Sequence, residues 1–203
     1  EVISAPELSY TINVDALLAA VTPRTRMLFV ANPASPTGTR VPFSEIKRLH
    51  AGLPAHVLLV LDGAYAEYAE GEADFDAGLA LAGDAPNVLV TRTFSKIYGL
   101  AALRIGWGYG APALADALNR IRLPFNVPAP SQAAALAALA DEAFLEESRI
   151  HAREGRAQLA RFLAGLGFEV IAPSANFVTA RIGDAQAIEQ AFAARGILVR
   201  ALA

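Results

Sequence analysis

Three short, unbroken apolar runs constrain the fold of this chain more than any other feature of the sequence. They are Met27–Ala31, Val57–Leu61 and Val88–Val90. Uninterrupted runs of this length are typical of strands that a parallel sheet buries on both faces. Helix-length segments separate the runs, and one predicted helix has Ser44 as its N-cap and ends near His50. We therefore predict an α/β fold with a mostly parallel sheet and helices on both of its faces.

Polar residues follow these apolar runs at the point where each predicted strand ends. Asn32, Asp62 and Thr93 lie at or just after the three ends, and Lys96 comes within the next turn. Because ligands collect at the carboxyl ends of strands in open α/β sheets, we expect a binding site there. A lysine partly shielded from water loses its proton more readily than an exposed one. Lys96 is therefore a candidate for imine formation with an aldehyde cofactor, the alternative being a solvated surface lysine.

The charge and residue composition of the chain argue against several classes of protein. The formal net charge is -3 with both signs interspersed, which gives no reason to expect a nucleic-acid or membrane partner. The lack of cysteine removes disulfides and thiolate metal sites, and the three histidines lack metal-ligand spacing. No apolar run is long enough to cross a bilayer, and residues 1–4 do not resemble a signal peptide. We expect a cytoplasmic globular protein.

The pattern of the chain changes after Arg104. Residues 123–130 are predicted to form a proline-rich, stiff joint, and a long amphipathic helix is predicted at 141–166. We place a domain boundary here, with a sheet-containing unit over 1–123 and a smaller, incomplete α+β unit over 124–203. The other elements predicted in this part are helices at 112–122, 131–140 and 185–195 and strands at 105–109, 168–171, 176–180 and 197–200.

Four motifs occur in an order and spacing that carry a family resemblance. They are residues 32–38 (NPASPTG), residues 62–65 (DGAY), residues 93–96 (TFSK) and Arg104, eight residues after the lysine. Together they resemble the fold-type I aminotransferases of class I/II, which depend on pyridoxal 5′-phosphate (PLP). Further motifs resemble the histidinol-phosphate aminotransferases of that family, namely residues 124–127 (PFNV), 174–177 (SANF) and 195–200 (RGILVR).

The resemblance covers essentially the whole chain and has consequences for the fold. It implies that residues 1–123 are the C-terminal half of an aspartate aminotransferase-like, PLP-binding large domain. Residues 124–203 would then be a small C-terminal α+β domain, itself incomplete. The chain thus looks like a fragment that begins inside the large domain and ends before the family's main carboxylate-binding arginine.

The resemblance also implies how the cofactor is held. Lys96 would carry PLP as a Schiff base and would later move the proton at the substrate Cα, because an amine can do both. Asp62 would pair with the pyridine nitrogen, and Tyr65 would hydrogen-bond the 3′-oxygen. Ser35 stands where the family usually has Asn, so its shorter side chain puts that second 3′-oxygen contact in doubt. Asn32 is also expected on the cofactor side. A helix N-cap role for Asp62 and a core role for Tyr65 are the alternatives.

The remaining implied roles concern the phosphate and the substrate. Thr93, Ser95 and Arg104 would hold the cofactor phosphate through two hydroxyl donors and one cation. An interior ion pair is the alternative for Arg104. Asn176 and Arg200 are assigned to the substrate side, although either could be structural.

The implied reaction is transamination between histidinol phosphate and 2-oxoglutarate, a step of histidine biosynthesis. Its partners are a small-molecule amine donor and a 2-oxo acid. Aromatic aminotransferases and threonine-phosphate decarboxylases are alternatives within the same family. Because members of the family build each active site at a dimer interface, we expect a homodimer. The alternative from another class is a catalytically silent fragment or an interaction module.

Overall fold

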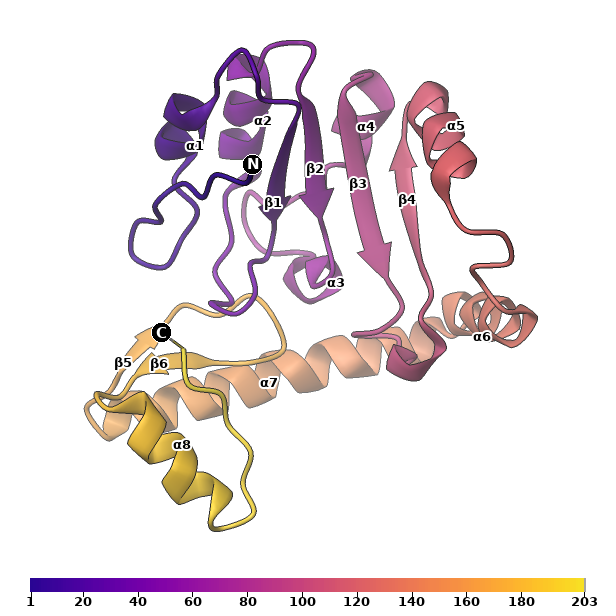
Figure 1. Cartoon of the computed structure of the whole chain (residues 1–203). Coiled ribbons are helices and arrows are strands. Elements are labelled where there is room, and N and C mark those ends of the chain that lie inside the picture. The colour runs from indigo at the N-terminus through magenta and orange to yellow at the C-terminus, as the bar shows by residue number, and fades with distance from the viewer. Residues whose placement is uncertain (203) are drawn as a thin grey trace.

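A mixed four-stranded sheet forms the first half of the chain in the computed structural model, which describes residues 1–202 (Figure 1). Its strands, in spatial order, are β1 (Met27–Ala31), β2 (Leu58–Asp62), β3 (Val88–Thr93) and β4 (Gly106–Gly110). The first three run parallel, and β4 pairs antiparallel with β3. The three apolar runs therefore form neighbouring parallel strands, as predicted, and their carboxyl ends share one edge of the sheet.

Helices connect and flank these strands. They are α1 (Val14–Ala20), α2 (Phe43–Gly52), α3 (Ala66–Ala69), α4 (Leu79–Asp84), α5 (Pro112–Ile121), α6 (Ala129–Ala140), α7 (Glu142–Gly165) and α8 (Ala185–Ala193), with a 3-10 turn at Ala101–Leu103. The side chains of Asn13, Asp141 and Asp184 cap α1, α7 and α8 by accepting a hydrogen bond from a backbone N–H of the first turn. The predicted N-cap role of Ser44 is wrong. Its hydroxyl lies one residue inside α2 and donates to Asp74.

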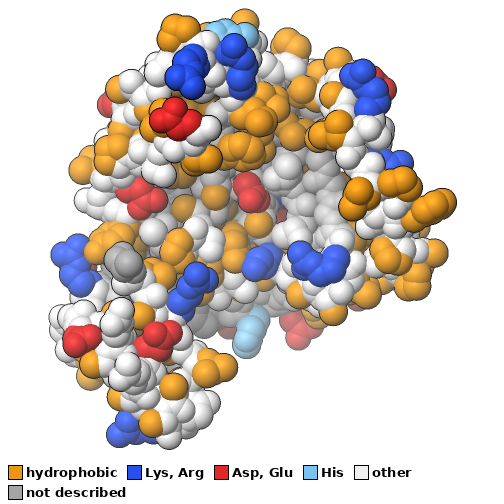
Figure 2. Space-filling view, viewed as in Figure 1, with side chains coloured by type: hydrophobic (Ala, Val, Ile, Leu, Met, Phe, Trp, Pro, Cys, Tyr) orange, Lys and Arg blue, Asp and Glu red, His pale blue; other side chains and the backbone are white. Residues whose placement is uncertain are grey.

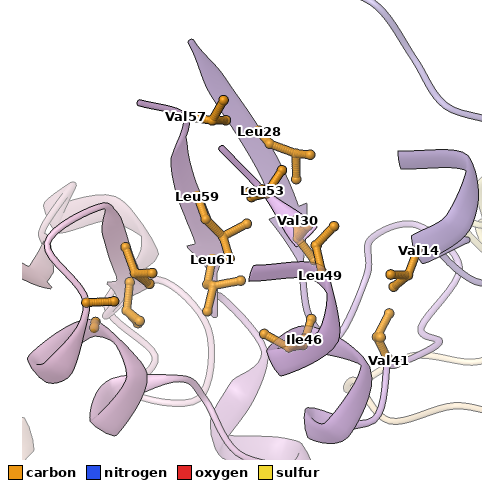
Figure 3. Close-up of a cluster of buried hydrophobic side chains, with 14 residues drawn as sticks. Val14, Leu28, Val30, Val41, Ile46, Leu49, Leu53, Val57, Leu59 and Leu61 are labelled. Atoms are coloured by element: carbon orange, nitrogen blue, oxygen red, sulfur yellow. The ribbon is translucent and has the colours of Figure 1, made fainter. Parts of the chain in front are cut away.

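The main core lies between the sheet and helices α1, α2 and α4. Val30 of β1 and Leu59 and Leu61 of β2 lie with Ile46 and Leu49 of α2 in this cluster (Figure 3). Each of these five residues exposes no more than 5% of its surface. Every second side chain of β1 and β2 points into this core, so the helices cover that face of the sheet.

The opposite face of β1 is open, which contradicts the prediction that this run is covered on both faces. Met27 and Phe29 expose 56% and 65% of their surface, whereas Leu28 and Val30 are buried. Successive side chains of a strand point to opposite faces, and the helices that pack on β1 lie on the Leu28 and Val30 side. Hydrophobic side chains gather over this part of the sheet in Figure 2. The apolar run at Met27–Ala31 therefore predicted a strand correctly, but it did not predict which faces of that strand are covered.

The second half of the chain carries a separate, smaller sheet beside the long helix α7 (Figure 1). It consists of β5 (Glu169–Ile171) and β6 (Thr179–Arg181), paired antiparallel. The strand predicted at 176–180 begins later, so Asn176 lies in the connection between β5 and β6. The strand predicted at 197–200 is wrong, since these residues pair with neither strand and Leu198 is 89% exposed. No helix within residues 1–202 is both long and apolar enough to cross a membrane.

Candidate active site

The carboxyl ends of β2 and β3 present two predicted site residues on one face of the sheet. Asp62 ends β2 two residues after Val60, and Thr93 ends β3 four residues after Leu89. Because Val60 pairs with Leu89 in register, the alternation of side chains places Asp62 and Thr93 on the same face, opposite the main core. The Asp62 side chain is exposed and accepts a 3.0 Å hydrogen bond from the backbone N–H of Ala64. That bond engages Oδ1 only, so the carboxylate keeps capacity for a further donor.

The turn that follows β3 gathers hydroxyl groups and one guanidinium. The backbone N–H of Ser95 donates to Thr93 Oγ1 at 3.0 Å, which fixes the Thr93 hydroxyl. Arg104 Nη1 donates to Ser95 Oγ at 3.2 Å and to the carbonyl of Ala101 at 2.8 Å. Within residues 1–202 Arg104 forms no ion pair, so its alternative role in an interior salt bridge is not observed there. Its charge, with the two hydroxyls, is suited to an anion.

Lys96 lies against an aromatic cluster at the same edge. Its Nζ is 5.0 Å from the centroid of the Tyr65 ring, a distance at which ammonium and ring attract one another. Tyr65 is 9% exposed and packs edge-on against Phe177, with ring centroids 5.4 Å apart. Lys96 itself is exposed, so the described residues do not provide the shielding that was expected for it. Its amine is therefore accessible to a small molecule, with the Tyr65 ring defining one side of its surroundings.

The loop after β1 holds the two remaining cofactor-side candidates. Asn32 is buried and uses both ends of its amide on Val41: Nδ2 donates to the carbonyl at 3.0 Å, and Oδ1 accepts from the N–H at 2.9 Å. This double contact closes the loop between the two residues. Ser35 lies exposed within that loop. The structure thus gives Asn32 a local role in loop shape and leaves Ser35 at the surface.

A cavity of about 350 Å³ lies between α7 and the connection that carries Asn176. Asn176 lines it together with His151 and Arg156, and Ile97, the neighbour of Lys96, forms part of its wall. The exposed side chain of Arg200 lies in the segment after α8. Neither a hydrogen bond nor an ion pair among residues 1–202 ties Arg200 to this cavity. Of the two substrate-side candidates, the structure therefore places Asn176, but not Arg200, in the cavity whose wall includes the neighbour of Lys96. In the same residues no cluster of three acidic or histidine side chains is placed to bind a metal ion.

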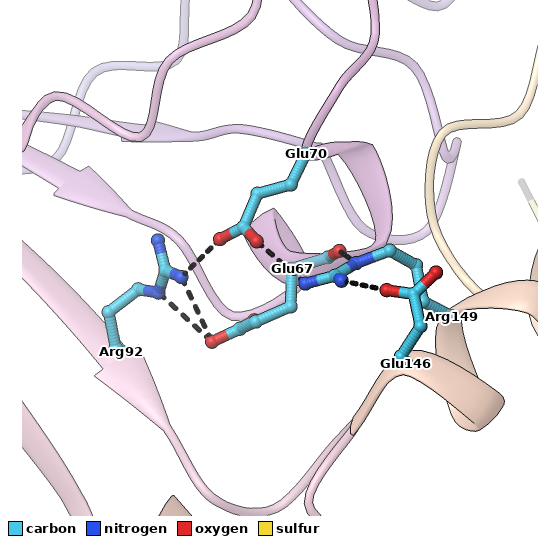
Figure 4. Close-up of polar contacts among 5 residues, drawn as sticks. All are labelled: Glu67, Glu70, Arg92, Glu146 and Arg149. Atoms are coloured by element: carbon cyan, nitrogen blue, oxygen red, sulfur yellow. Dashed lines mark hydrogen bonds and ion pairs between the residues drawn. The ribbon is translucent and has the colours of Figure 1, made fainter. Parts of the chain in front are cut away.

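A buried ion pair on α3 and β3 received no role from the sequence. Arg92 Nη2 lies 3.0 Å from Glu67 Oε1, and the two side chains expose 7% and 4% of their surface (Figure 4). Burial raises the pKa of the Glu67 carboxyl above its ordinary value, and Arg92 opposes that shift. A signal was present in the sequence: Arg92 lies two residues after Val90, in phase with side chains that face the core. A charge in that phase needs a partner.

Over residues 1–202 the chain matches the family described as aminotransferase class I and II. The chain belongs to this family. It is 47% identical over 205 residues to the histidinol-phosphate aminotransferase of Nitrobacter winogradskyi, an alignment that covers 98% of this chain and 56% of that protein. The resemblance recognised from the four motifs is thereby confirmed.

Solved structures of aminotransferases confirm the expected fold. The histidinol-phosphate aminotransferase of Sinorhizobium meliloti, in complex with pyridoxal-5′-phosphate, superposes with a TM-score of 0.89 at 33% identity, covering 98% of this chain and 55% of that one. A variant of the aspartate aminotransferase of Thermus thermophilus gives 0.76 at 26% identity, covering 92% and 54%. This aminotransferase chain spans about half the length of the relatives it matches.

Proposed function

We propose that this protein is a PLP-dependent aminotransferase of the histidinol-phosphate type, acting in histidine biosynthesis. The observation that carries the proposal is the position of the Lys96 amine, which is accessible and lies against Tyr65 at the edge where Asp62 and Arg104 also lie. Membership of the aminotransferase family supports it, and so does the similarity to histidinol-phosphate aminotransferases.

The side chains at this edge have the chemistry that PLP needs. Arg104, with the hydroxyls of Thr93 and Ser95, would hold the phosphate group; the existing contact between Arg104 and Ser95 already joins cation and hydroxyl. Asp62 would accept a hydrogen bond from the protonated pyridine nitrogen, and Lys96 would bind the aldehyde carbon covalently. When bound, PLP supplies an electrophilic carbon and a ring that withdraws electron density from the substrate Cα.

Each residue of the chain then has a distinct task. Once the substrate amine has displaced it from the cofactor, the Lys96 amine would be free to take up and return the proton at the substrate Cα. The negative charge of Asp62 favours a protonated ring nitrogen, and the Tyr65 hydroxyl would donate to the 3′-oxygen. The remaining proposed residues are Asn32 and Ser35 on the cofactor side and Asn176 and Arg200 on the substrate side.

The substrates, assembly and domain organisation follow as further parts of the proposal. The amine donor would be histidinol phosphate and the acceptor a 2-oxo acid, 2-oxoglutarate. An aromatic amino acid or a phosphorylated amino acid that is decarboxylated are alternative substrates. We place the enzyme in the cytoplasm as a homodimer, with residues 1–123 in a PLP-binding domain and 124–203 in a small C-terminal domain. The separate sheets of the two parts support this division.

Reductive labelling tests the cofactor assignment directly. The chain contains only two lysines, Lys96 and Lys47, so Lys47 on α2 serves as an internal reference. The protein is incubated with PLP, reduced with borohydride and mapped by mass spectrometry. We expect the pyridoxyl group on Lys96 in clear excess over Lys47, and no such excess in Lys96→Ala. Equal labelling of the two lysines would overturn the proposal.

The substrate assignment needs a separate assay on the same protein. Protein loaded with PLP but not reduced that forms glutamate from 2-oxoglutarate with histidinol phosphate, but not with phenylalanine, would support the proposed substrate. Turnover of phenylalanine alone would point to an aromatic aminotransferase. Specific labelling of Lys96 without turnover of any amine would identify this chain as catalytically silent.

A further inference from the structure

The ion pair between Glu67 and Arg92 lies directly behind the proposed active site. Arg92 follows Val90 by two residues, so it projects from the core-facing side of β3, whereas its neighbour Thr93 projects from the opposite face, on the side of Asp62. Glu67 lies in α3, two residues after Tyr65. The pair thus joins the two segments that carry Tyr65 and Lys96, while the sheet separates it from the ligand side.

The contacts of Arg92 join it to α3, to residues on either side of that helix and to β4. Its Nε and Nη2 both reach Glu67 Oε1, at 3.1 and 3.0 Å, and Nη2 also lies 3.3 Å from Glu70 Oε1. The stem of the arginine passes over Gly63, where an added Cβ would come within 2.9 Å of Arg92 Cδ. The guanidinium carbon lies 5.8 Å from the centroid of the Trp107 ring. A one-ångström shift of α3 along β3 would break this set of contacts.

The same network extends to the long helix. Arg149 of α7 donates through Nε to the backbone carbonyl of Glu67 at 2.9 Å and through Nη2 to Glu70 Oε2 at 2.7 Å (Figure 4). Glu70 therefore accepts from Arg92 with one oxygen and from Arg149 with the other. Through this carboxylate, β3, α3 and α7 are held in one arrangement.

Stability alone does not account for a buried pair of this kind. Arg92 Nη1 is buried without a hydrogen-bond partner among the described residues, and an unpaired polar atom opposes folding. Apolar residues of similar volume are often as stabilising as a buried ion pair, or more so. The charged pair differs from an apolar contact in being directional. Two nitrogens of Arg92 converge on one oxygen of Glu67, and one of them also reaches Glu70, so few relative positions of the two segments keep all of these contacts.

We infer that Glu67 and Arg92 are positioning residues that set Tyr65 against Lys96. The inference rests on the proposed function, since the position of the Tyr65 ring matters if Lys96 attaches the cofactor. Neither residue touches the ligand side of the sheet; both act by holding α3 and β3 in register.

A double substitution separates this role from a purely structural one. In Glu67→Met or Arg92→Met alone, one buried charge loses its partner, and the midpoint of thermal unfolding should fall by roughly 10 °C. In the double variant Glu67→Met/Arg92→Met no charge is left unpaired, and the midpoint should return to within a few degrees of the wild type. The matched control is Asp116→Asn/Arg120→Met, which removes an exposed ion pair on α5 and should change none of the readouts.

Two readouts then report on position in the double variant. The first is hydrogen exchange of the Tyr68 and Gly99 amides, which donate to the carbonyls of Tyr65 and Lys96. We expect both to exchange about tenfold faster than in the wild type, with the amides of β2 unchanged. The second is reductive PLP labelling, in which the ratio of Lys96 to Lys47 should fall about tenfold, because small misplacements of reacting groups have large effects on rate.

The outcomes are distinguishable from those of the proposed function. A double variant with wild-type unfolding midpoint, exchange and labelling ratio would show that the pair is only structural and would overturn the inference. If the double variant does not fold, Arg92→Lys takes its place, because lysine keeps the positive charge but has only one nitrogen to donate. The same changes in hydrogen exchange and in the labelling ratio are then expected. If PLP does not label Lys96 in preference to Lys47 in the wild type, the proposed function is refuted. The hydrogen-exchange data would still decide whether the Glu67–Arg92 pair fixes the position of α3 relative to β3.

Discussion

The carboxylate of Glu72 accepts a 2.8 Å hydrogen bond from the hydroxyl of Ser174, 102 residues further along the chain. The same carboxylate accepts from Arg40 Nε at 2.8 Å and from Arg156 Nη2 at 3.3 Å. Arg156 in turn donates through Nη1 to the carbonyl of Ala175 at 2.9 Å. A single acidic side chain therefore fastens the loop after β1, the helix α7 and the segment that leads to Asn176.

Removing the Glu72 carboxylate should destabilise the contact between these three segments. In Glu72→Ala three donors lose their acceptor, and we expect the free energy of unfolding to fall by about 2–3 kcal/mol. In a chain of this length that corresponds to a fall in Tm of roughly 5–10 °C by calorimetry. Glu154→Ala, an exposed carboxylate on the same long helix, is the control and should leave Tm within about 1 °C. Equal Tm values for the two variants would contradict the arrangement.

Two glycines of β4 should differ sharply in their tolerance of a methyl group. A Cβ at Gly106 would lie 2.5 Å from the carbonyl oxygen of Arg92, a backbone atom that cannot move aside, whereas at Gly108 the nearest atom is Leu89 Cδ1 at 3.5 Å. We expect Gly106→Ala to destabilise the protein by about 1–3 kcal/mol through forced displacement of β4. Gly108→Ala should change stability by less than about 1 kcal/mol. Urea unfolding of both variants measures the difference, and similar midpoints would mean that β4 is not paired in this register.

The strands of the first sheet could be predicted because their signal is local. An unbroken apolar run of three to five residues bounded by polar or turn residues favours a strand, and all three runs form strands. What covers a strand is not local. Phe29 is as apolar as its neighbours, yet it is exposed because no described helix packs on its side of β1. Ile197 and Val199 have strong strand propensity, yet their segment pairs with neither strand of the second sheet, so propensity alone was not sufficient there.

The candidate site divides in the same way. Thr93, Ser95 and Lys96 are close in sequence, and the turn that brings the two hydroxyls together is itself a local feature. Glu67 and Arg92 are 25 residues apart, and their pairing depends on the register of two segments that sequence spacing does not determine. The phase of Arg92 in its strand indicates that its charge needs a partner, but it does not identify Glu67.

Arg104 should contribute most of the charge that holds the cofactor phosphate. Arg104→Ala removes the cation and its contact with Ser95, and we expect the affinity for PLP, measured by absorbance titration, to fall by about 10–100-fold. Arg104→Lys keeps a point charge but not the fork, so its loss should be smaller. Inorganic phosphate should compete with PLP in the wild type and much less in Arg104→Ala. Arg120→Ala, which removes an exposed arginine of α5, is the control. An unchanged affinity in Arg104→Ala would place the phosphate elsewhere.

The phenol of Tyr68 should make the free energy of unfolding decrease at alkaline pH. Burial, reinforced by the nearby charge of Glu67, raises the pKa of Tyr68 to about 12 in the folded protein. The folded state therefore holds this proton more tightly than the unfolded state, where a tyrosine pKa is about 10. The resulting stabilisation is complete below about pH 10 and is lost as the pH rises through about 12, a change of about 2–3 kcal/mol.

Tyr68→Phe removes this titrating group, so its unfolding free energy should fall less than that of the wild type between about pH 9 and 12. Urea unfolding at a series of pH values gives the two curves. Tyr98, whose pKa burial also raises, remains in the variant and should leave a residual slope. Tyr109→Phe, which changes a tyrosine that is 46% exposed, should follow the wild-type curve. If Tyr68→Phe follows it as well, the Tyr68 hydroxyl reaches solvent, and the phenol is not buried as the structure has it.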